Sequence, residues 1–83
     1  MKKSIDGKYL KKLRTEAGIT QAELANRIKI SRETVINIEN NHPGSIESIE
    51  LPLIRDWKDA CKHAPSSVVE EFVDHLKKFL KIS

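Results

Sequence analysis

The chain has 83 residues, a single cysteine and a formal net charge of +3. This length suits one small domain over residues 1–83 and excludes a second, and a lone cysteine excludes an internal disulfide. The first residues contain no apolar run that is long enough for a signal peptide or a membrane span. The cytoplasm is therefore the expected compartment, and no membrane partner is expected.

The charge is distributed unevenly along the chain. Residues 1–41 hold nine Lys and Arg against five Asp and Glu, whereas residues 42–83 hold six against seven. The front part is therefore +4 and the back part −1. A polyanionic partner favours a basic front part, but a solvated basic face gives the same pattern. The charge alone leaves both interpretations open.

The hydrophobic pattern predicts an all-α fold, because no stretch alternates apolar and polar residues and apolar residues recur three and four positions apart. A first helix is expected over Asp6–Ala17. It should end at Gly18, because glycine takes the left-handed conformation of a helix C-terminus without strain. Thr20 and Glu23 have the spacing of a capping box, so a second, two-turn helix is expected to begin at Gln21.

A third short helix is expected over Arg32–Asn40, with Ser31 as its N-cap. A tight turn at Lys29 separates it from the second helix. The residues expected on its apolar side are Val35, Ile36 and Ile38.

The second half of the chain begins with a predicted loop over residues 40–45, which is rich in turn-forming residues. A fourth helix is expected over Leu51–His63, because Pro52 is tolerated only in a first helical turn. The spacing of Ser67 and Glu70 predicts a C-terminal helix over residues 67–81. The apolar face of this last helix is wide, so it either completes the core or pairs with a second copy of the chain.

One stretch of the chain resembles a known family. Residues 21–40, read together with Leu13-Arg14 and Gly18-Ile19-Thr20-Gln21, resemble the Cro/C1 (xenobiotic-response-element) family of phage and bacterial regulators. The resemblance covers Tyr9 to about Ile49. It implies a five-helix, lambda-repressor-like DNA-binding domain with its helix-turn-helix over residues 20–41.

In this arrangement the N-terminal end of the third helix projects and fits the major groove of DNA. Arg32 could bind guanine, and Asn37 could bind adenine. Glu33 could accept from cytosine or could instead hold Arg32 in place, and Thr34 could contact a thymine methyl group. Each of these four side chains would be an ordinary solvated residue if it made no base contact.

The resemblance also implies sites for DNA phosphates. The N-terminus of the second helix offers free N–H groups to an anion, although capping alone would explain Thr20. The residues expected to contact phosphates are Thr20, Gln21, Ser31, Asn40, Asn41, His42, Lys12 and Lys29, with Lys11 as a further candidate. The family pattern further suggests a structural ion pair between Arg14 and Glu39.

Two features depart from the family pattern. Lys29 stands where glycine is usual, so it must adopt a positive φ at a cost of roughly 1 kcal/mol, or the turn must differ. Pro52 falls where the family's fourth helix should continue, so the family pattern does not predict the packing after residue 49.

Other kinds of site are not expected. Cys61 and the three histidines, His42, His63 and His75, do not have zinc-binding spacing, so no metal and no cofactor are expected. No catalytic arrangement is visible, and an enzyme is not expected.

The sequence therefore predicts a transcriptional regulator, a repressor that binds a palindromic operator as a homodimer. The residues expected at the dimer interface are Trp57, Phe72, Leu76, Phe79 and Leu80. The alternative is a protein-interaction module that holds a partner protein and for which DNA binding is secondary or absent. A third interpretation is that the chain is the DNA-binding head of a longer regulator.

Overall fold

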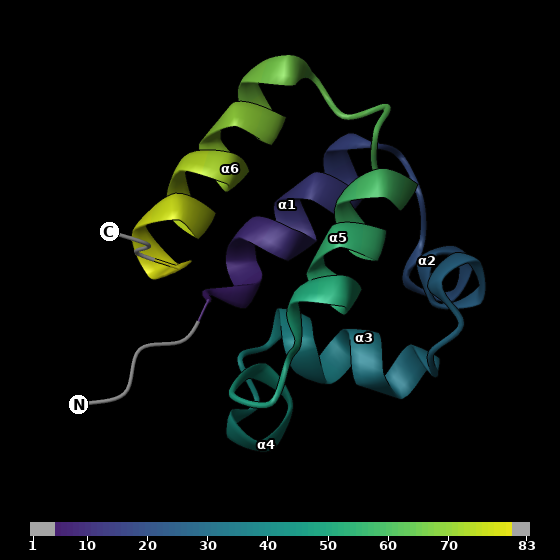
Figure 1. The fold of residues 1–83 in the computed structure, drawn as a ribbon. Coiled ribbons are helices and arrows are strands. Elements are labelled where there is room, and N and C mark those ends of the chain that lie inside the picture. The colour runs from purple at the N-terminus through teal and green to yellow at the C-terminus, as the bar shows by residue number, and fades with distance from the viewer. Residues whose placement is uncertain (1–4, 81–83) are drawn as a thin grey trace.

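The computed structural model describes residues 5–80, except for the side chains of residues 79 and 80. Within this range the chain forms helices and no strand, which confirms the all-α prediction. No helix of the described part is long and apolar enough to cross a membrane. In chain order the helices are α1 (Gly7–Glu16), α2 (Gln21–Ile28), α3 (Arg32–Glu39), α4 (Pro43–Ile46), α5 (Leu51–Ala60) and α6 (Ser66–Leu80) (Figure 1).

Helix α1 lies at the centre of the arrangement, between α6 on one side and α5 on the other (Figure 1). It packs against α6, α3 and α5, while α2 packs against α3 and α5. The core forms where these helices meet. The Trp57 side chain is fully buried there, and its indole Nε1 donates to the carbonyl oxygen of Leu10 at 3.1 Å. This hydrogen bond ties α5 to α1 and satisfies the polar atom of the largest core residue.

The ends of the first helices follow local sequence signals. The Asp6 side chain accepts from the N–H of Lys8 and caps α1. Gly18 has a φ of +77°, and the N–H groups after α1 return to carbonyl oxygens of its last turn. Thr20 and Glu23 cap α2 with both hydrogen bonds of a capping box. These signals therefore place α2 at its predicted start and both ends of α1 within one residue of the prediction.

The predicted loop over residues 40–45 was wrong in part, because residues Pro43–Ile46 form the single turn α4. Pro43 starts this turn, since its fixed φ suits a first helical position and its missing N–H is not needed there. Ile46 is buried, so α4 closes the core beneath α3. The described residues thus contain six helices, where five were expected.

The ends of the last two helices also differ from the prediction. Helix α5 ends at Ala60 and not at His63, because Cys61 leaves the helical conformation, with a φ of −105° and a ψ of 26°. Helix α6 begins at Ser66, one residue after Pro65. Ser67 therefore lies inside the first turn and does not cap the helix, and the predicted end at residue 81 lies outside the described residues.

This packing buries some of the residues that were predicted at the dimer interface and leaves others partly exposed. Trp57 and Phe72 are buried in the core of the chain itself, at 0% and 1% exposure, so they cannot form the surface of an interface. Leu76 is half-buried, and the side chains of Phe79 and Leu80 lie outside the described residues. Most of the apolar width of α6 therefore completes the core against α1.

Gly7 allows the start of α1 to lie directly against the end of α3. A Cβ atom at this position would collide with the carbonyl oxygen of Ile38 and would crowd the side chain of Asn41. Both atoms belong to well-held parts of the fold, so neither has room to give way. Glycine is thus required here by close approach rather than by backbone conformation.

We expect Gly7→Ala to lower the free energy of unfolding by about 1–3 kcal/mol, because the added methyl group overpacks the contact between α1 and α3. Urea unfolding followed by circular dichroism measures this change. Gly44→Ala is the matched control, since its added Cβ would meet only the His42 ring at 3.8 Å. The control should be neutral or up to about 1 kcal/mol more stable. Equal effects of the two substitutions would refute this account of Gly7.

Candidate nucleic-acid interface

A buried ion pair joins the first three helices. The guanidinium of Arg14 on α1 donates from Nε and Nη2 to the two carboxylate oxygens of Glu39 on α3, at 2.6 and 3.0 Å. Arg14 also donates to the carbonyl oxygen of Ile19, and Gln21 on α2 donates to Glu39 at 3.2 Å. One carboxylate therefore holds α1, α3 and the start of α2 in fixed relative positions.

Helix α3 turns one face to the core and the other outward. Val35, Ile38 and Glu39 are buried, whereas Arg32 and Glu33 are exposed. One turn further on, Ile36 and Asn37 are partly exposed. We call Arg32, Glu33, Ile36 and Asn37 the reading face, because these four side chains point away from the core.

Ile36 was wrongly predicted on the apolar side of this helix. It does not belong to the core or to the side chains that pack on it, and it lies one turn after Arg32 and Glu33. Its helical spacing from those two exposed residues was the signal that could have placed it outward. A partly exposed apolar side chain among polar ones suits contact with a thymine methyl group.

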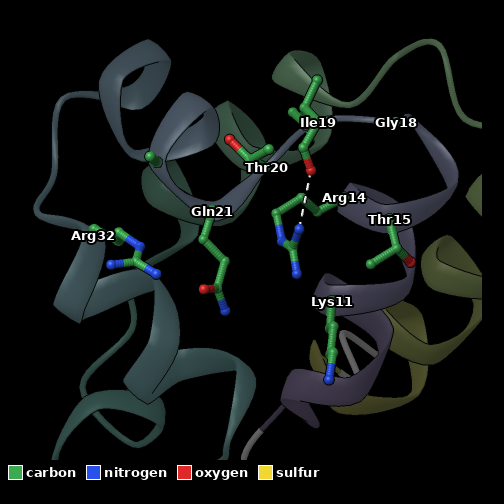
Figure 2. A pocket seen from close by; sticks show the side chains of 9 residues that line it. Lys11, Arg14, Thr15, Gly18, Ile19, Thr20, Gln21 and Arg32 are labelled. Atoms are coloured by element: carbon green, nitrogen blue, oxygen red, sulfur yellow. Dashed lines mark hydrogen bonds between the residues drawn. The ribbon is translucent and has the colours of Figure 1, made fainter.

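An open groove lies beside the reading face, between α1 and the start of α2 (Figure 2). Arg32 stands at one side of the groove in Figure 2, Lys11 at the other, and Gln21 between them. None of the lining residues is acidic, so the groove favours an anion. We call it the basic groove, and it is lined by Lys11, Arg14, Thr15, Gly18, Ile19, Thr20, Gln21, Ala22 and Arg32.

The N-terminus of α2 opens into the basic groove. The capping box uses the N–H groups of Thr20 and Glu23. This leaves the N–H groups of Gln21 and Ala22 without a partner among the described residues. The positive end of the helix dipole lies at the same place. A DNA phosphate would satisfy both the free donors and the dipole.

The structure separates the lysines that were considered as phosphate contacts. Lys11 lines the basic groove, whereas Lys12 turns toward α6, where its Nζ lies 3.1 Å from a carboxylate oxygen of Glu71. Lys29 lies in the turn between α2 and α3 and borders a different groove, together with Asp56 and Asp59. Of these three lysines, Lys11 is therefore the one that lies with Gln21 and Arg32.

The two turns that flank α3 are built differently. At the N-terminal side, Lys29 adopts a φ of 62°, so it accepts the left-handed conformation in place of the usual glycine. Ser31 then caps α3 by accepting from the N–H of Thr34, and the two hydroxyl groups are 2.8 Å apart. Thr34 also borders a groove that is lined by residues of α4, of α5 and of the segment between them.

At the C-terminal side, residues 40–42 form a compact turn. Asn41 has a φ of 59°, and the N–H groups of Asn41 and His42 return to the carbonyls of Ile38 and Asn37. This is the Schellman pattern that ends many helices. Asn40 and His42 are exposed beside the reading face, whereas the Asn41 side chain is occupied by hydrogen bonds to the start of α1.

The other titratable groups include candidate metal ligands and a candidate nucleophile. No group of three or more His, Cys, Asp or Glu residues there has the arrangement of a metal site. Cys61 is buried, and burial raises the pKa of its thiol to about 11. Such a thiol is protonated at neutral pH and has little nucleophilic character.

A short capped helix with an outward reading face, held beside a basic groove, defines a DNA-binding helix-turn-helix. Residues 10–49 match the family model that is described as helix-turn-helix. This model represents the Cro/C1-type helix-turn-helix family of DNA-binding transcription regulators, and the match covers just under half of the chain. A comparison with curated proteins and a comparison with solved structures each found no match.

We expect Glu39→Gln to lower the free energy of unfolding by about 3–5 kcal/mol, because the buried Arg14 charge loses its partner. Denaturant unfolding followed by Trp57 fluorescence measures the loss. Glu23→Gln is the matched control, since Glu23 forms an exposed ion pair with Arg27 and glutamine still suits a capping box. The control should change stability by less than about 1 kcal/mol. Losses of equal size in the two variants would contradict the structural role of Glu39.

Proposed function

We propose that this DNA-binding regulator is a repressor that binds a palindromic operator as a homodimer, with α3 in the major groove. One observation carries the proposal: the reading face and the basic groove lie side by side and share Arg32. Base edges in the major groove and phosphates on its border are therefore accessible to one surface of the chain.

Each member of the reading face suits a different base. Arg32 can bind the O6 and N7 atoms of guanine with its two-pronged guanidinium, and Asn37 can bind the N6 and N7 atoms of adenine. Glu33 accepts from the N4 amine of cytosine, and Ile36 packs against the methyl group of thymine. The mixture of polar and apolar groups supports sequence-specific reading rather than contact with phosphates alone.

Phosphate contacts fix the register of this reading. The free N–H groups of Gln21 and Ala22 bind one phosphate, and the ammonium of Lys11 lies in the same groove. On the other side of the reading face, the exposed residues Asn40 and His42 contact a second phosphate. The two clamps flank α3 and limit how it tilts in the groove.

Repression requires no contact surface beyond the one that binds DNA. A protein that occupies a promoter blocks the polymerase by occupancy, whereas activation requires an additional contact with the polymerase.

A homodimer is supported by the small size of a single reading head, which makes few base contacts, and a two-fold operator doubles them. Partly buried Val69, Val73 and Leu76, spaced by four and three residues along α6, form the apolar stripe proposed for the dimer contact.

Selection of the chain's preferred sites from randomised duplex DNA tests this proposal. We expect a palindromic motif whose half-sites lie about one helical turn, or 10–10.5 base pairs, apart. A reporter gene placed behind that motif should be expressed less when the chain is present. If only weak, salt-sensitive and sequence-independent binding is found, operator binding is refuted and a partner-protein module becomes the better interpretation.

The division between base reading and phosphate binding is tested by two substitutions. We expect Arg32→Ala to relax specificity at one base position, since a bidentate contact contributes about 1–3 kcal/mol of discrimination. Lys11→Ala should weaken binding to all sequences alike and reduce the salt slope by about 1. Affinities at several salt concentrations measure both effects.

Lys12→Ala is the matched control, because Lys12 adjoins Lys11 in sequence but pairs with Glu71 on α6. It should change affinity and salt slope less than Lys11→Ala does. A larger effect of Lys12→Ala would contradict the placement of the basic groove at the DNA.

A further inference from the structure

A hydrogen-bonded network joins α6 to the start of α1. The ring of His75 on α6 stacks on the ring of Tyr9, with centroids 4.1 Å apart and planes inclined by 20°. Its Nε2 accepts from the backbone N–H of Asp6 at 3.0 Å. An imidazole nitrogen accepts only when it carries no proton, so this hydrogen bond requires neutral His75.

The same part of α1 holds the turn that follows α3. The amide nitrogen Nδ2 of Asn41 donates to Oδ1 of Asp6 at 2.9 Å, and Oδ1 of Asn41 accepts from the N–H of Gly7 at 2.7 Å. The Asp6 carboxylate also caps α1 through the N–H of Lys8. The backbone of Asn41 lies between Asn40 and His42, which flank the reading face.

We propose that Asp6 and His75 are positioning residues: they hold residues 40–42 at the end of α3, and protonation of His75 releases this hold. The consequence for DNA rests on the proposed function, in which residues 40–42 contact a phosphate. In that case a fall in pH weakens DNA binding through a residue that touches no DNA.

The electrostatic surroundings of His75 agree with this geometry. Burial is the largest cause that lowers the pKa of His75 below its ordinary value of 6.5, and the cations of Lys78 and Lys8 lower it further, against the Asp6 carboxylate, which raises it. The other ionisable groups that line the hollow beside this ring are Tyr9, Glu70, Glu71 and Asp74.

The direction of the pH effect follows from the lowered pKa of His75. Since the pKa of His75 is lower in the folded chain, the unfolded chain binds the proton first. The hydrogen bond therefore stabilises the fold fully above pH 6.5, and its contribution is lost as the pH falls through the folded value. The pKa of Asp6 is itself lowered, chiefly by the hydrogen bond from Asn41, so Asp6 stays ionised across this window.

His42 complicates a direct measurement, because this exposed imidazole belongs to the proposed phosphate contact of residues 40–42. The test therefore uses His42→Gln as its background. Binding to a mixed-sequence duplex of about 20 base pairs, long enough for two half-sites, is measured at about pH 7.5 and at a second pH about one unit below the midpoint of the His75 ring, which nuclear magnetic resonance supplies. A mixed sequence makes the result independent of whether an operator exists.

We expect the background protein to lose about threefold to tenfold in affinity between the two pH values, the effect of removing one hydrogen bond. Adding His75→Gln should abolish this loss while keeping the affinity at high pH, because the glutamine oxygen accepts but does not titrate. Asn41→Gly keeps the left-handed backbone and removes both side-chain bonds, so it should bind weakly at both pH values. His63→Gln, which removes an exposed histidine elsewhere, should leave the loss unchanged.

Nuclear magnetic resonance of the chain without DNA supplies the second readout. We expect the Asn41 side-chain amide signals to shift with the same midpoint as the His75 ring. The proposal would be overturned if the Asn41 signals did not change over the pH range in which His75 titrates. It would also be overturned if the loss of DNA affinity at low pH persisted in the variant with His75→Gln. If the signals shift together while the DNA affinity stays flat, the positioning stands and the phosphate contact of residues 40–42 is what fails.

Discussion

The position of the reading helix depends on one buried carboxylate. Glu39 accepts two hydrogen bonds from Arg14 and one from Gln21, so a single residue near the end of α3 fixes α1 and the start of α2. Burying two charges costs solvation free energy, and such a pair contributes less to net stability than to geometry. Its geometric effect is large here, because Gln21 and Arg32 line the same groove only while the three helices keep this arrangement.

Helix α3 could not hold its own position, since an eight-residue helix is marginal without tertiary contacts. The fold therefore fixes it at both ends. The strained turn at Lys29 and the Ser31 cap set its start, and the close approach of Gly7 with the hydrogen bonds of Asn41 sets its end. The outward face between these ends remains free for DNA, which allows the reading residues to vary without disturbing the core.

The sequence predicts well the helix caps and turns that depend on neighbouring residues. The Thr20 and Glu23 capping box, the left-handed Gly18 and the Ser31 cap each depend on residues at most four positions apart.

Features that depend on packing were not predictable in this way. Apolar spacing indicates which face of a helix is buried but not which neighbour covers it, so Trp57 and Phe72 were assigned to an interface although the core contains them. Likewise, charge could not distinguish Lys11, in the basic groove, from Lys12, paired with Glu71.

The use of α6 within the core limits the strength of a homodimer that forms through this helix. Its largest described apolar residue, Phe72, is buried against the chain itself, which leaves partly buried Val69, Val73 and Leu76 for a partner. An interface of this kind buries little additional apolar area, and association must first offset a loss of translational and rotational freedom. Under the proposed function, two half-sites on DNA would bring the copies together at high effective concentration, which would remove most of that cost. If the chain binds the proposed two-fold operator, a weak dimer would therefore assemble chiefly on that DNA, so that occupancy would respond steeply to the concentration of the protein.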